Sequence, residues 1–185
     1  MSEYTFYAWG WIKPPRYSGE SWAFRPEFKL GITGREAWER GKGIFQSDDY
    51  FDFSTKRVVE GYYLKLIHCT KIRGLNGREE EAARALEKYM KNLLFNNKVF
   101  PNRQEFFTLP EGEELNPEKY LTKHVNIWIA YRAAKALEIP THELNFKFWT
   151  EETNNAYCKT QNRNLKDFLK DKRYREDKKA EFKRK

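Results

Sequence analysis

The sequence has few cysteines and no long apolar run. Its only two cysteines are Cys69 and Cys158, which exclude a disulfide-stapled mini-protein and fit a reducing compartment. With His68, His124 and His142 they cannot assemble four zinc ligands at finger spacing. No segment approaches the ~20 apolar residues of a membrane span, and the N-terminus lacks a secretory signal pattern. We therefore expect a cytoplasmic protein with no membrane partner.

Acidic residues are in the minority, and the excess of basic residues is concentrated at the C-terminus. The chain holds 35 Lys plus Arg against 27 Asp plus Glu, a net charge of +8. Residues 162–185 contribute eleven basic and five acidic side chains. Such a cationic segment favours contact with phosphate, although lysines that only keep a surface soluble are as common. We predict a basic helical tail with three candidate nucleic-acid contacts, Lys172, Arg173 and Arg175.

The tail also carries a small apolar patch, made of Leu165, Phe168 and Leu169. If the patch is exposed, residues 162–185 are dispensable for folding, and their removal weakens DNA binding. If the patch docks on the rest of the chain, the same truncation lowers the melting temperature. The sequence leaves these alternatives open.

Aromatic residues are abundant, at 17% of the 185 residues. This content excludes a disordered chain, and the length is enough to bury a core without staples. Some aromatics alternate with basic residues between Lys13 and Arg25, an arrangement that suits base stacking beside phosphate contacts. Aromatics of this kind are more often core residues, so both interpretations stand.

Hydrophobic periodicity predicts a mixed α/β (α+β) domain. We expect a small, largely antiparallel sheet flanked by helices, with a C-terminal helical extension. The expected strands are 4–12, 28–33 and 58–70, and the expected helices are 35–44, 78–96, 117–137 and 162–182. Two adjacent strand residues, His68 and Cys69, should point to opposite faces. The domain organisation that follows is a domain over 1–109, a helical extension over 110–161 and the tail over 162–185.

One acidic residue stands out on the helix predicted over 78–96. Glu87 falls in a stripe with Ala83, Met90 and Leu94 at helical spacing. A carboxylate among apolar neighbours requires a partner or a metal. Glu87 is therefore either a metal ligand or an edge residue that pairs with Lys91 four positions later.

Several short motifs occur in an order typical of one nuclease family. The strand residues Thr5-Phe6-Tyr7 and Lys29-Leu30-Gly31 are followed by Arg40, then by Glu87, then by the run 102–107. In this order and spacing the sequence resembles the GIY-YIG nuclease superfamily, in particular its phage-type branch often labelled a DNA-binding domain. The resemblance covers about residues 4–109. Lys29 stands where the second motif usually has tyrosine, and Ile44 where some members carry tyrosine or histidine.

The resemblance implies a divalent-metal-dependent DNA endonuclease that hydrolyses phosphodiester bonds. Glu87 would hold Mg²⁺ or Mn²⁺, Arg40 would offset charge on the phosphorane, and Tyr7 would orient or deprotonate water. Lys29 would lower the pKa of Tyr7. Arg35 and Asn102 would contact the nucleic acid.

Other interpretations of the same residues remain open. Tyr7 and Lys29 alone fit ordinary strand positions, one in the core and one facing solvent, and Arg40 fits an ion pair with Glu36. The alternatives to a nuclease are a catalytically inactive nucleic-acid-binding module and a protein-interaction or inhibitor protein. The sequence distinguishes neither DNA from RNA nor one oligomeric state from another.

Overall fold

The computed structural model describes residues 3–184 except 16, 43–49, 53, 56, 60, 114 and 145–150. Its strands are β1 (Tyr4–Lys13), β2 (Ala23–Thr33), β3 (Tyr50–Asp52), β4 (Arg57–Val59), β5 (Tyr63–Ile72), β6 (Lys98–Phe100) and β7 (Arg103–Phe107). Its helices are α1 (Ala37–Gly41), α2 (Glu79–Leu93), α3 (Pro117–Tyr131), α4 (Ala133–Leu137) and α5 (Glu151–Arg184), with short 3₁₀ turns η1 (Phe95–Asn97) and η2 (Thr141–Glu143).

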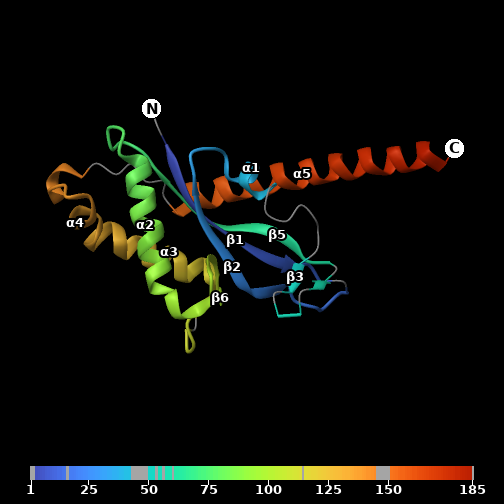
Figure 1. The fold of residues 1–185 in the computed structure, drawn as a ribbon, viewed down its shortest axis with the longest axis horizontal. Coiled ribbons are helices and arrows are strands. Elements are labelled where there is room, and N and C mark those ends of the chain that lie inside the picture. Colours follow the sequence, from blue (N-terminus) through green and yellow to red (C-terminus); the bar gives the residue numbers. More distant parts are fainter. Residues whose placement is uncertain are drawn as a thin grey trace.

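The main sheet has the strand order β5-β1-β2-β7-β6, and every neighbouring pair is antiparallel. Strands β3 and β4 form a separate ribbon. This arrangement of an antiparallel sheet with helices on both sides confirms the predicted α+β fold (Figure 1).

Strand β1 lies at the centre of the fold and is buried on both faces. Phe6 and Ala8 belong to the cluster covered by α2, α3 and α4. Trp9 and Trp11 belong to a second cluster, completed by residues of α1 and α5. A strand buried on both sides is apolar throughout, which explains the unbroken apolar run of β1.

The expected orientation of His68 and Cys69 is confirmed, and the structure adds a contact between the two cysteines. His68 and Cys69 do lie on opposite faces of β5, since His68 contacts the Phe6 ring and Cys69 joins the Trp9 cluster. The two free cysteines, however, lie close together, with the Cys158 Sγ 3.5 Å from the Cys69 Sγ. Their separation of 89 residues in sequence gave no sign of this contact.

Several predicted elements have different bounds in the structure. The hairpin of β1 and β2 is longer than expected, because Lys13 already pairs with Ala23. The strand predicted over 58–70 is two strands separated at Gly61, whose φ of 87° suits glycine. The helix predicted over 117–137 breaks at Arg132, and the one over 35–44 is described only as α1. Residue 44 lies outside the described residues.

The C-terminal half of the chain is dominated by α5, a continuous helix with no break at residue 162. Leu165 and Leu169 are buried in the cluster with Trp9, so the apolar patch docks on the body. The Asn162 side chain donates to the Leu66 carbonyl (3.1 Å) and accepts from its N–H (2.7 Å).

Beyond these contacts α5 projects away from the rest of the molecule (Figure 1). The projecting part includes the three basic residues predicted to contact nucleic acid, whose side chains lie outside the described part of the structure. In the part of the chain that is described, no helix combines the length and apolarity needed to cross a membrane.

Candidate active site at the free edge of β2

The two strand motifs meet at a cross-strand pair, Tyr7 on β1 and Gly31 on β2. A methyl group added at Gly31 would lie 2.4 Å from the Tyr7 hydroxyl oxygen and 2.6 Å from its ring carbon Cζ. The tyrosine ring therefore lies directly across the glycine. A side chain at position 31 would displace the Tyr7 hydroxyl. The need for this space explains why the second motif has glycine at this position.

This pair sits at an open edge of the sheet. Strand β7 pairs with β2 only at Phe28 and Lys29, so within the described residues no strand lies beyond 30–33. Because Tyr7 crosses Gly31 from β1, its hydroxyl points toward that edge. Both members of the pair are buried, and Tyr7 is only 1% exposed.

Arg40 approaches the tyrosine from α1, close enough for its guanidinium to lower the pKa of the Tyr7 hydroxyl. The helix lies close against the sheet because Gly41 has no side chain, and a Cβ there would be 2.8 Å from Trp9. Glu36, the alternative partner predicted from sequence, accepts instead from Gln161 (2.6 Å) and from the Tyr157 hydroxyl (3.3 Å).

The ionisation of Tyr7 differs from the sequence-based expectation. Burial raises its pKa above the ordinary value, and the carboxylates of Glu87 and Glu105 raise it further. The guanidinium of Arg40 opposes these effects, but burial has the largest effect on the Tyr7 pKa. The prediction that a cation lowers the pKa of Tyr7 overall is wrong, and Lys29 is not the cation that opposes burial. At neutral pH Tyr7 is a protonated hydroxyl that can orient a water or phosphate oxygen.

Lys29 is a mostly buried cation of the same cluster. Its side chain is only 16% exposed, and its Nζ lies 3.6 Å from the Glu105 carboxylate. Burial lowers the pKa of Lys29, as do the charges of Arg40 and Lys91, while Glu105 opposes them. Lys29 is thus not the solvent-facing strand residue that the simpler interpretation expected.

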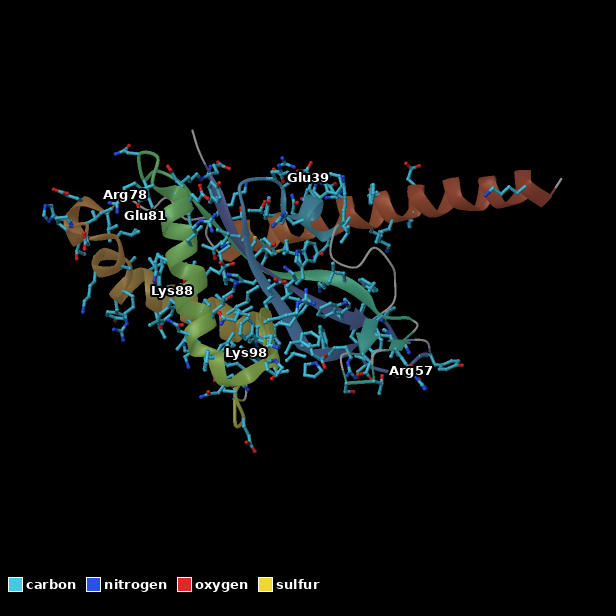
Figure 2. The ribbon with its side chains drawn as sticks, in the orientation of Figure 1. Glu39, Arg57, Arg78, Glu81, Lys88 and Lys98 are labelled. Atoms are coloured by element: carbon cyan, nitrogen blue, oxygen red, sulfur yellow. The ribbon has the colours of Figure 1, made fainter. Side chains whose placement is uncertain are left out.

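Glu87 joins the cluster from α2. Its side chain is 20% exposed and lies 3.6 Å from the Lys91 ammonium, so the predicted ion pair is present. Its charge also acts on Tyr7. Figure 2 shows the run of side chains along α2, with Lys88 labelled one position after Glu87.

Two carboxylates of this cluster, Glu87 and Glu105, act on the pKa of Tyr7. Among the described residues no group of three or more His, Cys, Asp or Glu is placed to hold an ion. Mg²⁺ commonly binds through one or two carboxylates, with waters and substrate phosphate as its other ligands. Glu87 and the half-buried Glu105 fit that donor set.

The other predicted contacts lie apart from the tyrosine. Arg35 is exposed and its backbone N–H donates to the Thr33 hydroxyl (3.0 Å). Asn102 is exposed in the turn between β6 and β7. Sequence reasoning missed Glu105 as a site residue, although it lies within the motif run 102–107. The described cavities beside α5 are lined by other residues, among them Tyr157 and Leu165.

Replacing Gly31 with alanine is expected to displace the Tyr7 hydroxyl and to slow any cleavage by about a hundredfold, because a misplacement of ~1 Å has effects of that size. Overpacking should also lower stability by about 1–3 kcal/mol. Single-turnover cleavage and thermal unfolding measure the two effects. In a Tyr7→Ala background the same change should cost almost nothing, and an equal loss in both backgrounds would contradict the contact.

Comparisons of this sequence and structure with family models, curated proteins and solved structures each gave no match.

Proposed function

We propose that the protein is a divalent-metal-dependent DNA endonuclease of the GIY-YIG type. The observation that supports the proposal is that Arg40 acts on the pKa of both Tyr7 and Lys29, while Glu87 acts on the pKa of Tyr7. These residues are far apart in sequence, and they come from β1, β2, α1 and α2. Cations, a hydroxyl and a carboxylate side by side are the groups that phosphodiester hydrolysis requires.

Each residue has a role in this proposal. Arg40 and Lys29 neutralise the scissile phosphate and the charge that grows on it in the transition state. The protonated Tyr7 orients the attacking water by its hydroxyl. Glu87, with Glu105 nearby, would hold Mg²⁺ or Mn²⁺, and the bound ion would supply Lewis-acid stabilisation of the phosphate and leaving oxygens.

Arg40→Ala is expected to slow cleavage by about a hundredfold or more, the usual scale for losing one preorganised electrostatic stabiliser. Plasmid nicking with Mg²⁺ or Mn²⁺ measures it. Lys123→Ala, which removes an exposed cation on α3, is the control and should leave the rate unchanged. Equal rates for parent and Arg40→Ala would remove Arg40 from the mechanism.

A catalytically inactive nucleic-acid-binding module is the second candidate. The Glu87–Lys91 ion pair favours it, because a lysine already neutralises the carboxylate that would hold the metal. DNA binding that weakens with salt, without cleavage in any divalent metal, would favour this module. DNA is the proposed partner in both cases, with RNA as the alternative to compare.

A further inference from the structure

An exposed phenylalanine continues the line of site residues along α2. Phe95 follows Lys91 by four positions, as Lys91 follows Glu87, so the three lie along one side of α2 and its continuation η1. The eight positions from Glu87 to Phe95 correspond to a rise of ~12 Å along the helix axis. Phe95 is 53% exposed, which places an aromatic surface within a few nucleotides of the proposed site.

Phe95 is held in this position by a rigid segment. Its neighbour Leu94 is completely buried, and the Leu94 N–H donates to the Met90 carbonyl (3.2 Å). The Asn97 side chain donates to the Leu109 carbonyl (2.9 Å), and the Asn97 carbonyl accepts from the Thr108 N–H (3.0 Å). The ring is therefore presented to solvent by a fixed backbone, which lowers the entropic penalty of binding.

Cations accompany the aromatic rings here. The Lys98 Nζ lies 4.1 Å from the centre of the Phe95 ring, and Figure 2 labels Lys98 beside the C-terminal end of α2. Arg103 lies over Phe100, at 5.7 Å from the ring centre, and its guanidinium is 4.0 Å from Glu105. The surface formed by Phe95, Lys98, Phe100 and Arg103, here called the aromatic platform, thus leads back to Glu105, the partner of Lys29.

We propose that the aromatic platform stacks an unpaired base of a single-stranded DNA segment that lies beside the phosphodiester to be cleaved. This inference rests on the proposed function and narrows its substrate class. Bases in a continuous duplex have both faces covered by their neighbours, whereas an unpaired base offers a free face to an aromatic ring. Alternating aromatic and basic side chains are the usual means of binding single strands, one stacking the base and the other neutralising the phosphate.

The test is binding without cleavage, in EDTA, to a labelled single-stranded oligonucleotide and to a hairpin duplex of the same composition. The parent should bind the single strand more tightly. Phe95→Ala should weaken single-strand binding by about tenfold, the scale of one lost base stack, and leave duplex binding nearly unchanged. Phe95→Trp should restore single-strand binding to the level of the parent. Tyr131→Ala, at an exposed aromatic on α3, is the control and should behave as the parent.

Two results would overturn the inference: equal affinity of the parent for both DNAs, or an equal effect of Phe95→Ala on both. Failure to bind either DNA would overturn it together with the proposed function. A protein that never cleaves with Mg²⁺ or Mn²⁺ but shows the Phe95-dependent preference would contradict the nuclease proposal alone. Thermal unfolding of each variant verifies that the mutated chain is folded.

Discussion

Glu87→Gln is expected to cleave DNA about a thousandfold or more slowly than the parent while binding it at least as tightly. Glutamine keeps the shape of the side chain and removes the charge that would hold the metal. It also removes a negative charge from a surface that contacts phosphate, so affinity should not fall. Because the ion pair with Lys91 is partly exposed, its loss should change stability by less than about 1 kcal/mol.

Single-turnover cleavage with Mg²⁺ and with Mn²⁺ measures this effect, with DNA binding measured in parallel. Glu81→Gln is the matched control, since Glu81 lies on the same helix, is exposed and pairs with Arg78 at 2.8 Å (Figure 2). It should cleave like the parent. Parent-like cleavage by Glu87→Gln would mean that Glu87 serves only as the partner of Lys91.

The second large effect is expected from two truncations of α5. Removing residues 162–185 takes Leu165 and Leu169 out of the core together with both hydrogen bonds of Asn162. Deleting one buried leucine side chain costs about 2–5 kcal/mol, and total stability is only about 5–15 kcal/mol. This truncation should therefore leave a largely unfolded chain. Removing only residues 171–185 spares these contacts and should leave the fold intact.

The shorter truncation isolates the electrostatic role of the helix. Residues 171–185 carry eight basic and four acidic side chains, so their loss should weaken DNA binding and flatten its dependence on salt. Thermal unfolding and binding at several salt concentrations measure the two effects. A melting temperature unaffected by removal of 162–185 would contradict the docking of α5, and an unchanged salt dependence after removal of 171–185 would contradict its contact with DNA.

Local pattern was enough to predict the fold class and the main elements. The apolar run of β1 and the apolar stripe of α2 are properties of neighbouring residues, and they predict a strand and a helix wherever these pack. The candidates Tyr7, Arg40 and Glu87 came from the resemblance to a nuclease family, which rests on the order and spacing of short motifs. Local pattern also gave the pairing of Glu87 with Lys91, because four residues is one turn of helix.

The burial and the charge partners of these residues are decided by the tertiary structure alone. The pKa of Tyr7 is set by its burial, and the partner of Lys29 by the return of β7 to β2. The docking of Leu165 and the contact between the two cysteines depend on where α5 crosses β5, which no local pattern encodes. Sequence by itself determined which elements form, since backbone and side-chain periodicity act over a few residues. Burial, charge partners and the open edge of β2 arise between distant segments, and only the packed structure assigns them.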